Sequence, residues 1–215
     1  MIRAIIFDYD DTLVETRLIK FEHHRTVAKK FYDIDISEET FLEHYGKPFN
    51  ILLNELYKGK DTLENMVKAN RSVQEQFLKK IYPDTKETIN KLFNQGLKLG
   101  ILTATNKNFV LEDLERHGIP SDHFALIQGP EETEVHKPDP AVFLPMLVKM
   151  KEWGIEKREI VYIGDSVRDL NAAVGAGLHF IAVTTGVHDE KEWKSLGADR
   201  VMKNISDLPA LVEKL

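Results

Sequence analysis

Residues 4–14 read AIIFDYDDTLV. The first four residues form a short apolar run of the kind that is typical of a buried strand. Asp8, Asp10 and Asp11 follow almost at once, so we expect these acids to lie just beyond the end of that strand. In open parallel sheets, ligands bind at this edge, outside the carboxyl ends of the strands. The stretch therefore predicts a strand with a functional site at its carboxyl end.

Further runs of the same kind recur along the chain, and helical patterns alternate with them. They span residues 97–102, 124–127, 160–163 and 180–183. Glycines at 96, 118 and 154 stand where glycine commonly ends a helix. Strands that alternate with helices form parallel sheets. The predicted fold class is α/β, with a Rossmann-like, doubly wound parallel sheet as its core.

Residues 15–82 interrupt this alternation, because they contain no strand-like run and instead predict four helices. The expected helix ends are near Asp33, Gly46, Gly59 and Tyr82. Residue types that favour helix starts are Ser37, Pro48 and the pair Asp61-Thr62. We therefore expect residues 1–14 and 83–215 to form the catalytic core and residues 15–82 to form an inserted four-helix cap.

The composition of the 215-residue chain excludes several classes of function. Its 29 Lys and Arg residues against 35 Asp and Glu residues give a formal net charge of -6, so no broad cationic surface is expected for nucleic acid or an anionic membrane. The absence of cysteine excludes disulfides, thiolate zinc sites and cysteine nucleophiles. No apolar stretch has the length of a membrane span or of a secretory signal core. We expect a globular, cytoplasmic protein.

Polar residues follow the expected strands, or open a helix, at one edge of the sheet. They are residues 8–12 (DYDDT), 103–106 (TATN), 136–138 (HKP) and 164–169 (GDSVRD). Crowded carboxylates repel one another unless a cation joins them, and oxygen ligands of this kind suit Mg²⁺. A carboxylate beside Mg²⁺ can attack phosphorus, while a second carboxyl group moves protons. The cluster therefore predicts a magnesium site and phosphoryl transfer.

These four motifs, in this order, resemble those of the haloacid dehalogenase superfamily of phosphotransferases, and the resemblance covers essentially the whole chain. The family's first motif, an apolar strand followed by Asp-x-Asp-x-Thr, is matched by IIFDYDDTL. The match implies that Asp8 is the nucleophile and that Asp10 is the general acid and base. The usual Gly after the second Asp is Asp11 here, a variant that leaves both functional positions intact.

The second and third motifs imply a phosphate site. A Ser or Thr that ends a strand is matched by Thr103 in LGILTATN, whose hydroxyl would bind a phosphoryl oxygen together with the backbone N–H of Ala104. The motif lysine is matched by Lys137 in HKPDP. Its charge would tie the nucleophile to the phosphate.

The fourth motif, Gly-Asp-Ser-x-x-Asp, is matched by GDSVRD and implies the metal ligands. Asp165 resembles a direct Mg²⁺ ligand, together with the Asp8 side chain and the Asp10 backbone carbonyl. Asp169 is implied as a support for Lys137 or for a metal-bound water.

The insert also agrees with the resemblance, because one branch of the superfamily carries a helical cap between its first two motifs. In related caps, a loop with a Gly-x-Pro-like element sets substrate choice, and residues 45–49 (YGKPF) resemble it. Lys47 is therefore the candidate that grips the far end of the substrate.

The predicted activity is Mg²⁺-dependent hydrolysis of a small phosphorylated metabolite, a phosphate monoester, through an aspartyl-phosphate on Asp8. A sugar phosphomutase stays open as an alternative, and so does a phosphonate hydrolase that uses Lys20 or Lys47 for a Schiff base. A non-catalytic phospho-receiver domain is disfavoured, because receivers are shorter, lack a cap and have no use for Asp10. Asp10 and Asp165 also argue against a dehalogenase. The motifs specify neither the substrate beyond its phosphoryl end nor the oligomeric state.

Overall fold

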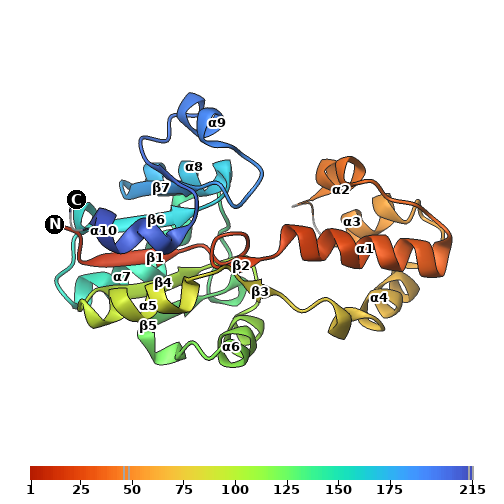
Figure 1. Ribbon diagram of the computed structural model, residues 1–215, viewed down its shortest axis with the longest axis horizontal. Helices are drawn as coiled ribbons and strands as arrows, with labels where there is room; N and C mark the ends of the chain where they lie inside the picture. Colours follow the sequence, from red (N-terminus) through yellow and green to blue (C-terminus); the bar gives the residue numbers. More distant parts are fainter. Residues whose placement is uncertain (46, 48, 213, 215) are drawn as a thin grey trace. The chain divides into compact units, whose positions relative to one another are not determined.

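Six strands form one parallel sheet in the order β5-β4-β1-β6-β7-β8 (Figure 1). The strands are β1 (Ala4–Phe7), β4 (Lys98–Leu102), β5 (Phe124–Gln128), β6 (Ile160–Gly164), β7 (His179–Val183) and β8 (Val201–Met202). They belong to a computed structural model that describes residues 1–45, 47, 49–212 and 214. The predicted α/β class with a parallel core is confirmed. Strand β8 was not predicted, because two residues carry no periodic pattern.

Strand β1 lies in the middle of the sheet, and its register determines which residues emerge together. Phe7 pairs with Ile101 of β4 on one side and with Ile163 of β6 on the other. The ladder continues one residue further, because the backbone N–H of Asp8 donates to the Ile163 carbonyl at 2.8 Å. The segments that follow β1, β4 and β6 therefore leave the sheet at the same edge.

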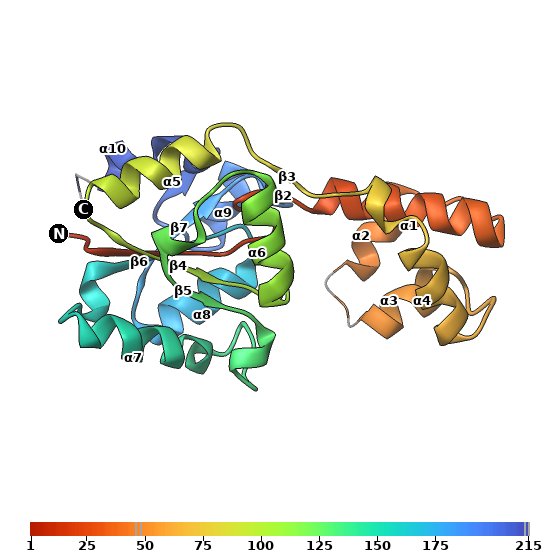
Figure 2. The same ribbon diagram turned by 90° about the horizontal axis from the view of Figure 1, so that it is seen from below.

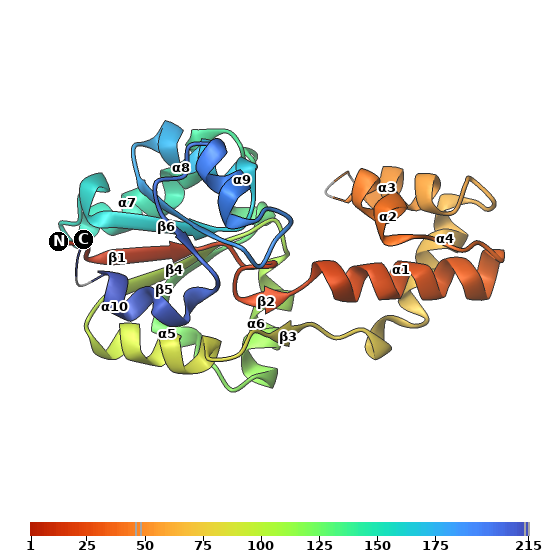
Figure 3. The same ribbon diagram turned by 45° about the horizontal axis from the view of Figure 1, so that its top comes forward.

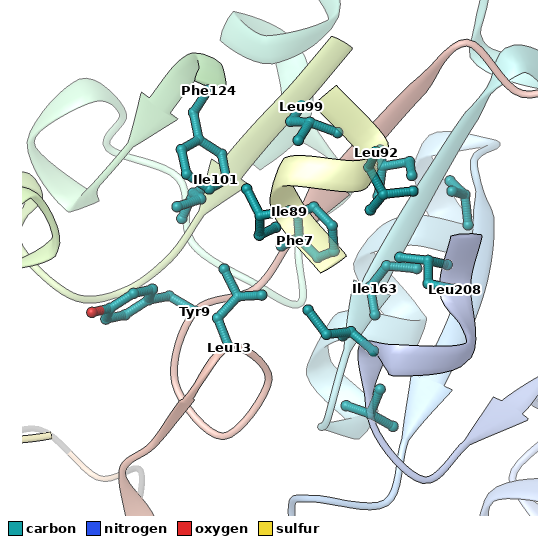
Figure 4. Packing of buried hydrophobic residues seen from close by; sticks show 14 of the residues in the cluster. Phe7, Tyr9, Leu13, Ile89, Leu92, Leu99, Ile101, Phe124, Ile163 and Leu208 are labelled. Atoms are coloured by element: carbon teal, nitrogen blue, oxygen red, sulfur yellow. The ribbon is translucent and has the colours of Figure 1, made fainter. Parts of the chain in front are cut away.

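One face of the sheet packs against helices α5 (Thr85–Asn94), α6 (Lys107–Arg116) and α10 (Leu208–Val212). Ile5 and Phe7 point to this face, because alternate residues of a strand face opposite sides. Figure 4 shows Phe7 among residues of α5, α10 and the neighbouring strands. The labelled residues of this cluster are Phe7, Tyr9, Leu13, Ile89, Leu92, Leu99, Ile101, Phe124, Ile163 and Leu208.

The opposite face packs against helices α7 (Leu144–Glu152), α8 (Val167–Ala176) and α9 (Glu190–Ser195). Ala4 and Ile6 of β1 point to this side. Figures 2 and 3 show α5 and α10 on one side of the sheet and α7 and α8 on the other. Since both faces are covered, all four residues of β1 are fully buried.

The chain divides into two compact units, one formed by Met1–Glu15 with Ile81–Leu215 and the other by Thr16–Lys80. The second unit contains helices α1 (Arg17–Tyr32), α2 (Glu38–His44), α3 (Phe49–Leu56) and α4 (Leu63–Arg71). We call it the cap unit and the first the core unit. The cap unit has an apolar cluster of its own, built around residues such as Phe41, Leu53 and Tyr57.

Two helix starts in the cap unit are as the sequence indicated. The Ser37 hydroxyl accepts from the backbone N–H of Thr40 at 3.1 Å, and the Thr62 hydroxyl accepts from the backbone N–H of Asn65 at 3.3 Å. These bonds satisfy backbone donors that have no partner within the helix. The predicted helix signals at Gly46 and Pro48 lie outside the described residues.

The expected end of the fourth cap helix near Tyr82 is wrong. Helix α4 ends at Arg71, and its C-cap residue Ser72 donates its side-chain hydroxyl to the Ala69 carbonyl at 2.7 Å. A short 3₁₀ turn and strand β3 (Lys80–Ile81) follow, and β3 pairs with β2 (Val14–Glu15). Hydrogen bonds within the turn at Ser72 thus close the helix, and the backbone of β3 then pairs with β2.

The remaining elements are short. They are the 3₁₀ helices Gln74–Gln76, Ser121–His123, Pro130–Glu132, Pro140–Phe143, Lys157–Glu159 and Ile205–Asp207. Within the described part of the chain, no helix has both the length and the apolar character needed to cross a membrane.

Candidate active site

Asp8 stands at the carboxyl end of β1, where the residue is 6% exposed. The chain then turns back on itself, with the N–H of Leu13 donating to the Tyr9 carbonyl at 2.9 Å and that of Asp11 to the Val14 carbonyl at 2.8 Å. Asp11 has a φ of 52° in this turn. Glycine is favoured in that left-handed region and Asp is among the residues that tolerate it, so the turn keeps its shape with Asp11.

Lys137 connects three of the motifs. Its Nζ lies 2.9 Å from Asp8 Oδ1, 2.7 Å from Asp169 Oδ1 and 3.1 Å from the Tyr162 hydroxyl oxygen. An ammonium group has three donors, and these contacts give each of them a partner. The Lys137 side chain is 11% exposed, so solvent screens these contacts little. The lysine therefore holds the Asp8 carboxylate in one place.

Asp169 is fully buried in the first turn of α8 and uses both of its oxygens. Oδ1 accepts from Lys137 and from the Tyr162 hydroxyl, the latter at 2.9 Å. Oδ2 accepts from the backbone N–H of Ser166 at 3.0 Å and from the Ser166 hydroxyl. This arrangement locks the first turn of α8 and fixes the direction in which Lys137 points.

Asp165 completes a cluster of carboxylates with Asp8 and Asp169. One oxygen from each of the three side chains lies within 4.8 Å of the others. Burial raises the pKa of Asp8, and repulsion from Asp169 and Asp10 adds to this while Lys137 opposes it. Burial, followed by repulsion from Asp8 and Asp169, also raises the pKa of Asp165 well above its usual range. Both shifts indicate that Lys137 alone does not supply enough positive charge to stabilise the ionised forms of these buried carboxyl groups.

The donor set is suitable for a divalent cation. Three carboxylates and one ammonium group leave a formal charge of -2 (three negative charges less one positive charge). Burial by itself would lower the pKa of Lys137, but attraction to Asp169 and Asp8 outweighs it and raises that pKa. The lysine thus stays charged. The remaining negative charge lies on carboxylate oxygens, which are the ligands that Mg²⁺ and Ca²⁺ prefer.

The loop after β4 lies beside the second acid of the first motif. Thr103 is 6% exposed, and its hydroxyl accepts from the backbone N–H of Thr105 at 3.0 Å. Ala104 is exposed at the tip of the same loop. The Thr105 hydroxyl donates to Asp10 Oδ2 at 2.5 Å. The structure thus brings Asp10 together with the segment that contains Thr103.

Lys47 belongs to the cap unit, where it is exposed. Its Nζ lies 2.9 Å from His44 Nδ1. Lys20, the other lysine weighed for a Schiff base, has its Nζ 5.9 Å from the centroid of the Tyr45 ring. The flanking residues Gly46 and Pro48 of the expected specificity loop lie outside the described residues.

Three further residues in the core unit contact this cluster and were not predicted to do so. Tyr162 bridges Lys137 and Asp169, and a hydroxyl-bearing residue inside an otherwise aliphatic strand was a signal that could have identified it. Arg168 donates from Nε to the Lys137 carbonyl at 3.0 Å, which holds the lysine loop against α8. Gly186 had no signal in the sequence.

Gly186 follows β7 and packs directly against Asp165. A Cβ atom built on Gly186 would lie 2.7 Å from the Asp165 backbone oxygen and closer still to the carboxylate. Any side chain at position 186 would therefore have to push Asp165 away. The absence of a side chain here is what allows the two segments to approach.

Comparison with known proteins is consistent with this geometry. The family model described as haloacid dehalogenase-like hydrolase matches residues 5–183. The pyrophosphatase PpaX of Oceanobacillus iheyensis is 27% identical to the chain over 98% of its length and 97% of the relative's. The phosphoglycolate phosphatase of Yersinia pestis is 27% identical, with 98% and 93% covered. The crystal structure of a candidate beta-phosphoglucomutase from Thermotoga maritima shares the fold, with a TM-score of 0.83, 24% identity and full coverage of both chains.

Proposed function

The chain belongs to the haloacid dehalogenase-like hydrolase family, and on this basis we propose that it is a Mg²⁺-dependent phosphatase that hydrolyses a small phosphate monoester through an aspartyl-phosphate on Asp8. The observation that carries the proposal is the contact of 2.9 Å between Asp8 Oδ1 and Lys137 Nζ, within a cluster that also contains the half-buried Asp165 and the buried Asp169. A carboxylate held this way has a fixed direction of attack, and the lysine beside it can bind the incoming phosphoryl group.

In the first half-reaction, an Asp8 oxygen attacks phosphorus and forms the acyl-phosphate bond while the bond to the leaving oxygen breaks. Asp10, in its protonated form, donates its proton to that leaving oxygen. Lys137, the Thr103 hydroxyl and the Ala104 backbone N–H would bind the phosphoryl oxygens during the transfer. The leaving alcohol then departs with the proton that Asp10 supplied.

In the second half-reaction, Asp10 acts as a carboxylate. It takes a proton from a water molecule as the water oxygen bonds to phosphorus, and the bond between phosphorus and Asp8 breaks. Inorganic phosphate is released, and both aspartates return to their starting protonation states. The presence of an acid two residues after the nucleophile is what favours turnover over a stable phosphorylated protein.

The residues that would hold Mg²⁺ are the side chains of Asp8 and Asp165 and the backbone carbonyl of Asp10, with Asp169 as a support. When bound, the ion would offset the repulsion between the Asp8 carboxylate and the phosphoryl oxygens and stabilise the charge that develops during transfer. The raised pKa values of Asp8 and Asp165 support this assignment, because both carboxyl groups lie where a cation would stabilise their charged forms.

The substrate is proposed to carry a second anionic group. The pyrophosphatase and the phosphoglycolate phosphatase that the chain resembles act, by their names, on compounds with two anionic groups close together. We propose Lys47 as the residue that binds the second group. The variant Lys47→Ala should then raise KM for such a substrate and leave the rate with p-nitrophenyl phosphate, which has no second anion, unchanged.

The proposal is tested by a phosphate-release screen over pyrophosphate, phosphoglycolate, sugar phosphates and nucleoside monophosphates, with Mg²⁺ and with EDTA. Wild type is compared with Asp8→Asn and with Asp199→Asn, which changes an exposed aspartate of the core unit in the same way. We expect release that requires Mg²⁺, is lost in Asp8→Asn and persists in Asp199→Asn. Release that survives in Asp8→Asn would refute the nucleophile. Isomerisation of a sugar phosphate with little phosphate released would favour a mutase.

A further inference from the structure

The loop between β4 and α6 contains a threonine that the family motifs do not use. Thr105 is half-buried, and its hydroxyl donates to Asp10 Oδ2 at 2.5 Å, at the short end of the range for a hydroxyl–carboxylate hydrogen bond. The two residues are 95 positions apart in the sequence. The contact therefore exists only because β1 and β4 are neighbours in the sheet.

Hydrogen bonds of the residues before and after Thr105 in the chain fix the position of its side chain. Its own backbone N–H donates to the Thr103 hydroxyl at 3.0 Å. The next residue, Asn106, is the N-cap of α6 and accepts from the N–H of Asn108 at 3.0 Å. Thr105 thus lies between a turn closed by Thr103 and the first turn of a helix, so its hydroxyl has little freedom to move.

A second contact joins the same two segments independently. Tyr9, between Asp8 and Asp10, is fully buried, and its hydroxyl donates to Asp113 Oδ2 of α6 at 2.8 Å. The turn after β1 is therefore tied to α6 through Tyr9 and to the loop before α6 through Thr105. Two links of this kind keep the Asp10 carboxyl group in one orientation relative to that loop.

We propose that Thr105 is a positioning residue for the acid and base of the reaction: by donating to Asp10 Oδ2, it places the exchangeable proton on Oδ1 and holds the plane of the carboxyl group. This inference rests on the proposed phosphatase function and assigns a role within it. The physical reason is that an oxygen that accepts from a hydroxyl is a poorer site for a proton than the other oxygen of the same carboxyl group.

The proton balance is the same as in the two half-reactions. In the first, the proton leaves Oδ1 of Asp10 for the leaving oxygen as the phosphorus–Asp8 bond forms. In the second, Oδ1 accepts a proton from water as that bond breaks. Thr105 donates to Oδ2 throughout and exchanges no proton with the substrate. Its contribution is therefore largest where the leaving group most needs a proton.

This dependence supplies the test. The value of kcat/KM is measured for p-nitrophenyl phosphate, whose leaving group departs without a proton, and for the alkyl phosphate of the screen that the wild type hydrolyses fastest. Thr105→Val removes the hydroxyl but keeps the branched shape and the backbone bond to Thr103. We expect kcat/KM to fall about 10- to 100-fold for the alkyl phosphate, part of the 10²- to 10⁴-fold that a positioned acid contributes, and less than about threefold for the aryl phosphate.

Thr105→Ser keeps the hydroxyl and should restore most of the activity with the alkyl substrate. Thr184→Val is the matched control, since the Thr184 hydroxyl lies 3.5 Å from the Lys203 carbonyl oxygen in the same unit. Equal losses on both substrates in Thr105→Val, with wild type active and Asp8→Asn inactive, would overturn the inference and leave the proposed function standing. No activity of the wild type, or retained activity in Asp8→Asn, would overturn both.

Discussion

Acidification should destabilise the cap unit through one histidine, His24 of α1. The residue is 4% exposed, and the Nδ1 atom of His24 lies 2.9 Å from the Tyr57 hydroxyl oxygen. That hydroxyl donates to Asn70 Oδ1 at 3.0 Å, and the Asn70 amide donates to the Met66 carbonyl at 2.8 Å. The chain of hydrogen bonds satisfies a neutral imidazole and contains no carboxylate that would stabilise a charged one.

The pKa of His24 follows from this environment. Burial, with smaller contributions from His23 and Lys20, lowers it from 6.5 to about 3. Well above pH 6.5 the ring is neutral in both the folded and unfolded states, and it adds almost no pH dependence. Below pH 6.5 the unfolded chain takes up a proton that the folded cap does not, so the free energy of unfolding falls until the pH reaches the folded pKa.

The size of the effect can be calculated for a drop from pH 7.5 to pH 5. At pH 5 the solution is 1.5 pH units below the pKa of 6.5 that His24 has in the unfolded chain. At about 1.4 kcal/mol per unit, His24 removes about 2 kcal/mol of stability, a large share of the stability of a small folding unit. The corresponding loss between pH 7.5 and pH 6.5 is only about 0.4 kcal/mol.

Urea unfolding of wild type and His24→Asn at pH 7.5, 6.5 and 5 measures this contribution. Asparagine keeps a side-chain amide close to the position of Nδ1 but does not titrate. Both tryptophans of the chain, Trp153 and Trp193, belong to the core unit, so their fluorescence reports unfolding of the core, while far-UV circular dichroism includes the cap helices. The two signals together separate the cap transition from that of the core.

We expect His24→Asn to be less stable than wild type at pH 7.5, because it leaves a cavity, yet to lose about 2 kcal/mol less on going to pH 5. The pKa of His23 is also lowered, chiefly by burial, and its contribution is present in both proteins. Parallel pH dependences of wild type and His24→Asn would refute the reasoning, since they would mean that His24 titrates normally in the folded cap.

Two further predictions concern the active site. Tyr162→Phe removes the hydroxyl between Lys137 and Asp169; because a hydrogen bond to a charged group contributes about 1.5–3 kcal/mol, kcat/KM should fall at least about tenfold with the thermal midpoint lowered by only a few degrees. An unchanged kcat/KM in the phosphate-release assay would show that the hydroxyl does not position Lys137. Gly186→Ala should raise the Mg²⁺ concentration for half-maximal activity about tenfold, because the new methyl group displaces Asp165. A Mg²⁺ titration identical to that of wild type would contradict this packing argument.

Much of the architecture could be predicted from the sequence because it depends on local patterns. The predicted run at residues 4–7 coincides with β1. The bounds of the four further predicted runs agree with those of β4, β5, β6 and β7 to within one or two residues. The parallel arrangement follows from their alternation with helices, and the parallel arrangement places the polar ends of the strands at one edge. The sequence therefore predicts that the acids after β1 and β6 lie together at that edge.

Local patterns failed where the chain departs from regular periodicity. The end of α4 at Arg71 is closed by hydrogen bonds within the next turn, such as that from the Ser72 hydroxyl to the Ala69 carbonyl, and no strong helix-stop residue announces it. The pairing of β2 with β3 depends on hydrogen bonds between residues that are distant in the sequence. Strand β8 is too short to show alternation, and it exists because β7 offers it an edge. In both strand pairings, the partner of the backbone groups lies far away in the sequence.

The supporting contacts of the site are decided by tertiary structure alone. Thr105 reaches Asp10 across 95 positions, and Lys137 reaches Tyr162 across 25. Gly186 matters because the loop after β7 approaches Asp165 so closely that a single methyl group would not fit. The residue types that can attack, protonate and bind a cation were visible in the sequence, since chemistry depends on side-chain identity. The partners that orient those residues were not, because orientation depends on the packing of helices and loops against the sheet.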